Sequence, residues 1–351
     1  MSDKKKARED TIRRQLQTTN ILRGEETSLD NNEINNVDIY FALYPGEVFA
    51  DRYKVLHKIG EGGMGLVYKV EDLEDDHVIK ALKVTIVAAE SESEVHIKRF
   101  TREINMMRKL HHPNIVTLYE AGQFEKRWYY TMNFIEGKLF TMDTWNDLSV
   151  EDGLRILIQI AKAVHHAHQK NILHRDLKPE NIIWTSDHQA FLMDFGIAKS
   201  LGYNTKLTDS DTVIGSLYYL SPEQASGDSD IDARSDVFAL GVVLYQFLTR
   251  SLPFMGTSNM MVINAILRSE PISPRSIRSE ISEDLQKVCL TALEKNRELR
   301  YVSAERFAED LESVLHDEPP QLITTSSSYY LVYVGIIVVI IYIWIYLGTF
   351  Y

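Results

Sequence analysis

A dense group of polar side chains lies near the middle of the chain. The residues from His174 to Asn181 include carboxylates, cations, a histidine and an amide, and apolar residues flank them at 172–173 and 182–184. A further carboxylate, Asp194, begins an Asp-Phe-Gly run shortly afterwards. Carboxylates, an amide and cations at this density could orient a reacting hydroxyl and neutralise an anionic group. Short charged runs are usually solvated turns, but the two apolar runs predict strands that would hold this loop rigid.

The order of these residues resembles the catalytic loop and the metal-binding motif of protein kinases, and the resemblance extends from about Tyr53 to Leu315. It implies that Asp176 orients the substrate hydroxyl and accepts its proton, while Lys178 steadies the γ-phosphate of ATP. Asn181 and Asp194 would hold Mg²⁺, with Mn²⁺ as a possible substitute. The lysine at position 178 implies specificity for serine and threonine.

Glycines 60, 62 and 65 lie between two runs, 53–56 and 66–70, that predict strands, and the first strand is expected to begin at Val48. This arrangement predicts a hairpin lid, because glycine lets backbone N–H groups approach phosphate oxygens. An ordinary hairpin turn is the alternative. The resemblance implies that Lys83 holds the α- and β-phosphates, whereas Lys80 on the same strand is expected to point to the opposite face and be solvated. The nucleotide site implied by the resemblance comprises Ile59, Gly60, Glu61, Gly62, Gly63, Met64, Gly65, Leu66, Val67, Ala81, Lys83, Met132 and Ile183.

Two helices are predicted around this site. The first covers 91–110, and the resemblance implies that its Glu103 pairs with Lys83; a surface acid is the alternative. The second covers 149–169, with Ser149 at its start, and leads into the catalytic loop. Histidines at 111–112 and 165–168 superficially suggest a metal site, but we interpret them as packed or solvated side chains.

The residues after the Asp-Phe-Gly run resemble the activation segment of bacterial serine/threonine kinases. Ser216 stands where threonine is usual, and its hydroxyl is expected to bond Asp176. Thr208 and Ser210 match the positions that are phosphorylated in those kinases. Arg175 is expected to be a buried or half-buried cation that such a phosphate could pair with. The alternative is that these hydroxyls are only the polar surface of a mobile loop.

Two further expectations concern the helical part of the chain. The resemblance implies that Arg300 pairs with Glu223. Residues 236–249 are apolar nearly all round, which predicts a core helix. The single cysteine, Cys289, lies in an apolar helical pattern and is expected to be buried and inert.

Composition bounds the partners and the location. A net charge of −12 argues against a nucleic-acid-binding surface. Residues 1–45 are polar and are expected to be disordered. Residues 329–351 are almost wholly aliphatic and aromatic and, as a helix of roughly 34 Å, would cross a hydrocarbon core of about 30 Å. A buried core helix is the alternative for this segment.

The expected fold is therefore α+β, a two-lobed protein kinase fold followed by a transmembrane helix. A kinase domain of 46–316 would comprise a β-rich N-lobe of 53–136 and a helical C-lobe of 137–316, and residues 317–328 would link it to the membrane helix. We expect a serine/threonine protein kinase that uses MgATP and acts on proteins. It would be a single-pass protein of the cell membrane with its kinase domain in the cytoplasm. A homodimer could phosphorylate the activation loop of its partner copy.

Two alternatives belong to other classes. A pseudokinase scaffold would bind nucleotide and partners without catalysis. Pseudokinases usually lack a catalytic lysine or carboxylate, and none of these residues is missing from this sequence. A small-molecule kinase of the same fold is disfavoured by the segment 221–223, which protein kinases use in building a peptide platform.

Overall fold

The computed structural model describes residues 42–62, 65–85, 102, 104–125, 127–195 and 214–322. From Leu43 onward these residues belong to one compact unit. Of the segment 1–45 that was predicted to be disordered, residues 1–41 lie outside the described residues, as do 329–351. For the end of that segment the prediction was wrong, because Leu43 is buried and its backbone N–H donates to the Tyr68 hydroxyl at 2.9 Å. Five of the predicted site residues also lie outside the described residues, namely Gly63, Met64, Glu103, Thr208 and Ser210.

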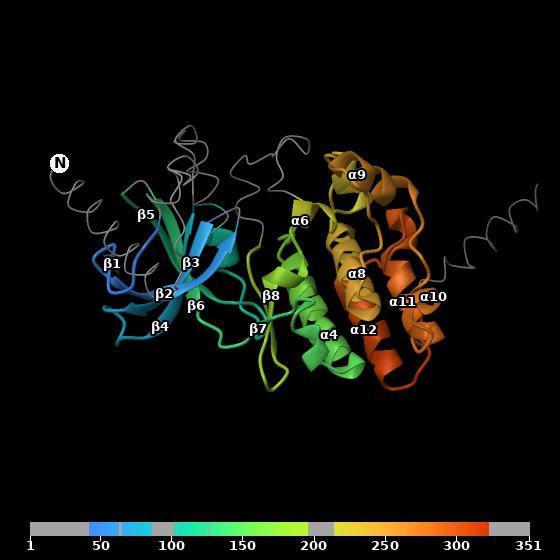
Figure 1. The fold of residues 1–351 in the computed structure, drawn as a ribbon, viewed down its shortest axis with the longest axis horizontal. Coiled ribbons are helices and arrows are strands. Elements are labelled where there is room, and N and C mark those ends of the chain that lie inside the picture. The colour runs from blue at the N-terminus through green and yellow to red at the C-terminus, as the bar shows by residue number, and fades with distance from the viewer. Residues whose placement is uncertain are drawn as a thin grey trace, which may run out of the picture. The chain divides into compact units, whose positions relative to one another are not determined.

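The N-terminal part is an antiparallel sheet of six strands in the order β1-β2-β3-β4-β6-β5 (Figure 1). Its side chains alternate between two faces, as period-two strands require. One face carries the apolar cluster of Ala81, Tyr130 and Met132, with Val67 packed against it. The strands are β1 (Val48–Phe49), β2 (Tyr53–Gly62), β3 (Gly65–Asp72), β4 (Ile79–Thr85), β5 (Leu118–Phe124) and β6 (Arg127–Asn133).

Two predictions for this sheet were wrong. The strand expected from Val48 is divided into β1 and β2, because Ala50 and Asp51 turn the chain with φ angles of 53° and 56°. Lys80 does lie on the face of β4 opposite Lys83, but it is only 3% exposed. Its ammonium is buried with partners, since it lies 2.6 Å from the carboxylates of both Asp72 and Asp75.

The C-terminal part is mainly helical. Its helices α4, α8, α11 and α12 pack together (Figure 1). Helix α4 begins after Ser149, whose hydroxyl accepts a hydrogen bond from the backbone N–H of Asp152, as predicted. Every residue of helix α8 from Ser235 to Thr249 is buried, which confirms the predicted core helix. Gly153 lets α4 approach α8 closely, because a Cβ there would lie 2.0 Å from the ring of Phe247. The helices are α4 (Val150–His168), α6 (Ile214–Leu217), α7 (Pro222–Ala225), α8 (Arg234–Thr249), α9 (Asn259–Arg268), α10 (Pro274–Ile277), α11 (Glu283–Ala292) and α12 (Ala304–Leu315), with short 3₁₀ turns η2 (Trp145–Asp147), η3 (Pro179–Asn181) and η5 (Arg297–Leu299).

A second, small sheet lies beside the catalytic loop. It consists of β7 (Lys138–Leu139), β8 (Ile182–Trp184) and β9 (Ala190–Leu192) in that order. The apolar run after the loop is therefore a strand, as predicted. The run before it, Ile172–Leu173, is not a strand, so the prediction of strands on both sides of the loop was wrong.

Two observations concern the predicted cysteine and membrane segments. Cys289 is completely buried in α11, and burial raises the pKa of its thiol, which agrees with an inert side chain. Within the described part of the chain, none of the helices combines the length and apolar character needed to cross a bilayer.

Candidate active site

The backbone of the catalytic loop is held by a carboxylate from the core helix α8. Asp236 is 2% exposed and accepts hydrogen bonds from the backbone N–H groups of His174 and Arg175 at 2.8 and 2.9 Å. The His168 ring lies 2.7 Å from the same carboxylate. Burial alone would raise the pKa of Asp236, but the His168 hydrogen bond and charge outweigh it and lower that pKa. The start of the loop, where a strand was predicted at 172–173, is thus fixed by the ionised carboxylate of Asp236.

The His174 ring connects this loop to the Asp-Phe-Gly segment. Its Nε2 lies 3.0 Å from the Met193 carbonyl oxygen, so Nε2 carries the proton, and its Nδ1 lies 3.4 Å from the backbone nitrogen of Asp176. The ring also packs against Phe195, with 4.7 Å between ring centroids. Burial lowers the pKa of His174, which favours this neutral tautomer. The catalytic loop and the Asp-Phe-Gly segment are therefore held next to each other by the His174 ring.

Lys178 connects the Asp176 carboxylate to Ser216, which lies in α6. Its ammonium lies 3.1 Å from the Asp176 carboxylate and donates a 2.8 Å hydrogen bond to the Ser216 hydroxyl. The predicted link between Ser216 and Asp176 thus runs through the ammonium of Lys178. Asp176 is 7% exposed and Lys178 is half-buried, so both lie at the edge of the protein interior, where a substrate could reach them.

Asn181 is oriented by its own loop. Its side-chain nitrogen donates a 2.7 Å hydrogen bond to the backbone carbonyl of Asp176, and its backbone carbonyl oxygen accepts from the backbone N–H of Met193 at 3.0 Å. Because the amide nitrogen is used in this way, the side-chain oxygen is the end available to a ligand. An amide oxygen and the Asp194 carboxylate are hard donors of the kind that Mg²⁺ prefers, so these two residues fit the metal that the resemblance implies.

Asp194 contacts two residues of the large sheet. Lys83 Nζ lies 2.6 Å from its Oδ2, and the Tyr130 hydroxyl donates to its Oδ1 at 2.8 Å. Burial alone would raise the pKa of Asp194, but the charge and hydrogen bond of Lys83 outweigh that effect and lower it. Asp194 is therefore an ionised carboxylate in a half-buried position.

Three of the predicted nucleotide residues, Val67, Ala81 and Met132, share one face of the large sheet. Ala81 and Met132 are directly opposite on β4 and β6, and Val67 is opposite Lys83 on β3 and β4. Ile183, half-buried in β8, comes from the helical part. Such an apolar lining suits a planar base, with backbone groups left to fix its orientation.

The glycine hairpin contains one position that requires glycine. Gly65 has a φ of +145°, and a Cβ there would lie 2.2 Å from the Val84 carbonyl oxygen. Leu66 and Val67 are consecutive residues of β3, so the Leu66 side chain points to the face of the sheet opposite Val67. Among the other predicted nucleotide residues, Ile59 and Glu61 are exposed, Gly60 is half-buried, and Gly62 ends β2.

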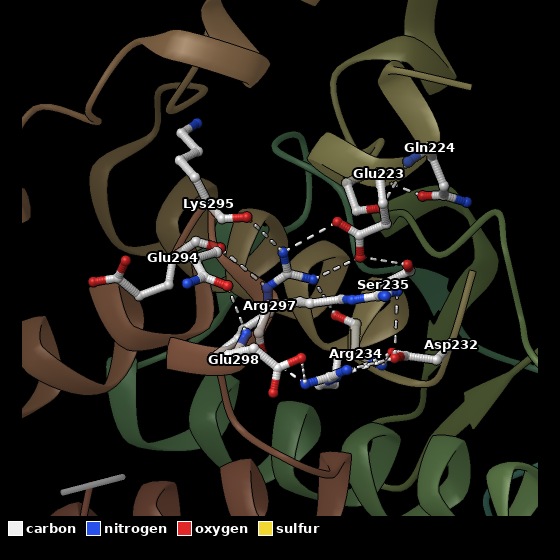
Figure 2. Close-up of polar contacts among 12 residues, drawn as sticks. Glu223, Gln224, Asp232, Arg234, Ser235, Glu294, Lys295, Arg297 and Glu298 are labelled. Atoms are coloured by element: carbon white, nitrogen blue, oxygen red, sulfur yellow. Dashed lines mark hydrogen bonds and ion pairs between the residues drawn. The ribbon is translucent and has the colours of Figure 1, made fainter. Parts of the chain in front are cut away.

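The closing part of the activation segment is anchored by an ion pair. Arg300 is 1% exposed and donates to the Glu223 carboxylate at 2.8 and 3.2 Å, which confirms the predicted pair. The Ser235 hydroxyl donates to the same carboxylate at 2.6 Å, and Figure 2 shows Glu223 and Ser235 pointing toward one another. Arg234 lies beside them, paired with Asp232.

Sequence reasoning missed the roles of Asp236 and Tyr130. The signal for Asp236 was a carboxylate at the start of an otherwise apolar helix, where a charge needs a partner. The signal for Tyr130 was a hydroxyl two residues before Met132, on the same face of its strand. The described residues contain no group of three or more His, Cys, Asp or Glu side chains arranged to hold a metal.

Arg175 differs from its prediction. It is exposed, not buried or half-buried, and its backbone has a φ of 62°. The expectation that burial makes a partner necessary for this cation was therefore wrong.

Comparison with known proteins identifies one family. A model of the protein kinase domain matches residues 53–311. The chain is 36% identical over 268 residues to the probable serine/threonine-protein kinase PknB of Lactococcus lactis, 37% over 280 to PknB of Mycobacterium leprae, and 35% over 270 to PrkC of Bacillus subtilis. These matches cover 76%, 78% and 76% of this chain but only 42%, 44% and 41% of those proteins. The crystal structure of the Mycobacterium tuberculosis PknI kinase domain is similar as well, with a TM-score of 0.61 at 27% identity, covering 78% of this chain and 99% of that one.

Proposed function

The chain belongs to the protein kinase family, and we propose that it is a serine/threonine protein kinase, which transfers the γ-phosphate of ATP to serine and threonine hydroxyls of proteins. The observation that carries the proposal is the contact between Lys178, Asp176 and Ser216. It joins the carboxylate that would receive the proton to the segment that would present the peptide. The curated relatives are named serine/threonine kinases, which supports the same specificity.

Each residue would have a distinct role in the transfer. Asp176 would orient the attacking hydroxyl and take its proton, and Lys178 would neutralise charge on the moving phosphate. Lys83 would hold the α- and β-phosphates, and Asn181 with Asp194 would bind the metal. Mg²⁺ bound there would neutralise charge on the phosphate oxygens.

Substitution of the proposed base tests this function. Purified full-length protein should transfer label from γ-labelled ATP to a generic protein substrate, and Asp176→Asn should lower kcat at least about a hundredfold. Asp187→Asn, an exposed carboxylate in the β8–β9 turn, is the matched control and should retain activity. A wild-type protein that binds ATP but transfers no label would instead be the pseudokinase scaffold. Transfer to small alcohols in preference to proteins would indicate a small-molecule kinase.

Activation by phosphorylation of Thr208 or Ser210 is a second part of the proposal. It is supported by the resemblance of this segment to that of bacterial kinases. Arg175, next to Asp176, is an exposed residue and would supply a cation for this phosphate. A phosphate adds about −1.5 to −2 charges and can form one to three charge-assisted hydrogen bonds, which is enough to order a loop. The donor could be a second copy of the chain.

Attachment to the cell membrane is the third part. Its support is the composition of residues 329–351, which are long and apolar enough to span a bilayer as a helix. Because ATP is cytosolic, the kinase domain would lie on the cytoplasmic side. A membrane would also confine copies to a plane and so favour phosphorylation of one copy by another.

A further inference from the structure

The Asp194 carboxylate is gripped by two side chains that leave the sheet side by side. Lys83 on β4 and Tyr130 on β6 are directly opposite in the strand register, so both project from the same face. Lys83 contacts Oδ2 at 2.6 Å, and the Tyr130 hydroxyl contacts Oδ1 at 2.8 Å. Each oxygen of the Asp194 carboxylate therefore accepts one hydrogen bond from a side chain of the sheet.

The surroundings strengthen the Tyr130 contact. Tyr130 is 4% exposed and borders a small cavity whose other lining residues, apart from Asp194, are apolar. A hydroxyl buried in such surroundings is costly without a partner, and a hydrogen bond to an ionised acceptor is stronger than one between neutral groups.

We propose that Tyr130 is a positioning residue, which fixes the Asp194 carboxylate in the orientation that binds Mg²⁺ together with the nucleotide. This inference rests on the proposed kinase function. A carboxylate offers about four acceptor sites, so the bonds to Lys83 and Tyr130 leave each oxygen able to contact a metal. Without the hydroxyl, Oδ1 would lose its fixed donor, and the carboxylate could rotate about its Cβ–Cγ bond. Metal binding would then have to restrict this rotation, and the resulting loss of conformational entropy would weaken the binding of Mg²⁺.

The test compares Tyr130→Phe with Tyr129→Phe. Both remove only a hydroxyl from neighbouring residues of β6, but Tyr129 lies on the opposite face and packs edge-on against Phe49 and Tyr53. The dissociation constant of a fluorescent ADP derivative is measured in EDTA and in excess magnesium chloride for full-length protein. The coupling ratio is the dissociation constant in EDTA divided by the dissociation constant in magnesium chloride. It measures how strongly the metal promotes nucleotide binding, independently of phosphate transfer.

We expect Tyr130→Phe to lower this coupling ratio at least about fivefold, with little change of the constant in EDTA, and Tyr129→Phe to leave the ratio within about twofold of wild type. The half-saturating Mg²⁺ concentration for phosphate transfer should rise in Tyr130→Phe alone. An unchanged or increased ratio in Tyr130→Phe would overturn the inference, and so would an equal loss in both variants.

The outcome is separable from that of the proposed function. If the wild-type protein transfers phosphate and Tyr130→Phe keeps the wild-type ratio, the inference fails and the function stands. If the wild-type protein couples Mg²⁺ to ADP but transfers no phosphate to any substrate, the kinase proposal fails, and the ratio still decides the role of Tyr130.

Discussion

At the scale of single residues, two buried cations of this protein are explained by their partners. Lys80 lies between two carboxylates, and Arg300 is held by Glu223, so neither cation needs solvent. Pairing offsets the cost of removing these charges from water, but removal of one partner leaves the other charge buried and uncompensated. Pairs at the surface carry much less free energy, because water screens them.

Arg300→Met should therefore be strongly destabilising. The variant leaves the Glu223 carboxylate buried without its cation, and we expect the free energy of unfolding to fall by about 3–5 kcal/mol. Lys162→Met is the matched control, since it breaks the surface pair of Lys162 with Glu312, and it should cost about 1 kcal/mol or less. Urea titrations followed by tryptophan fluorescence measure both. Equal losses in the two variants would show that the burial of the Arg300 pair carries no special weight.

The same pair should make stability depend on pH. Burial alone would raise the pKa of Glu223, but Arg300 outweighs it and holds that pKa below its ordinary value of 4.5. A lowered pKa in the folded state contributes stability above the unfolded-state value, and this contribution is lost as the pH falls through the folded-state value.

The free energy of unfolding of wild type minus that of Glu223→Gln should thus be constant from pH 7 down to about 5.5 and should shrink below about 4.5. Urea titrations of the two proteins at a series of pH values give this difference. A difference that grows on acidification would contradict the assigned ion pair.

At the scale of elements, α8 serves two purposes. Its apolar length fills the core of the helical part, and Asp236 near its first turn holds the catalytic loop through two backbone N–H groups. The activation segment has a comparable anchor at its end, where Glu223 in α7 meets Arg300.

Thr208→Ala combined with Ser210→Ala should lower kcat at least about tenfold. Without hydroxyls to accept phosphate, ordering the loop would cost about 1–2 kcal/mol for each fixed backbone residue without the gain from charge-assisted hydrogen bonds. Steady-state kinetics measures the effect, and mass spectrometry of active wild-type protein should find phosphate on this loop. Thr205→Ala, on the same loop, is the control and should stay active. Full activity of the double variant would refute activation through these two hydroxyls.

At the scale of the whole molecule, the chain combines a kinase domain with terminal segments that lie outside the described residues. The family model ends at residue 311, and α12 ends at Leu315. The apolar residues 329–351 therefore follow the last described helix by little more than a dozen positions. A membrane anchor at this place would keep the active site close to the bilayer surface.

Deletion of residues 329–351 should move the protein from the membrane fraction to the soluble fraction after cell lysis. The reason is the loss of the one segment whose composition suits a hydrocarbon environment. The catalytic rate of the purified protein should change by less than about twofold, because the residues of the candidate active site lie within residues 59–300. Immunoblots of fractionated lysates decide the point. An unchanged membrane fraction would exclude this segment as the anchor.

The order of residues along the chain was enough to predict elements wherever the pattern is local. A period of two indicated the strands on either side of the glycine hairpin and the opposite faces of Lys80 and Lys83. The roles of the residues in the catalytic loop and the hairpin, like the pair of Arg300 with Glu223, were implied by the family resemblance.

Only the tertiary structure decided which distant residues meet. Asp236 is 62 positions from His174, and Tyr130 is 64 positions from Asp194, so neither contact leaves a local pattern in the sequence. Strand alternation placed Lys80 on the correct face, but what covers that face depends on how β3 and its following turn pack. The physical reason is that side-chain periodicity is a property of one element, whereas burial and charge pairing are properties of two elements brought together by folding.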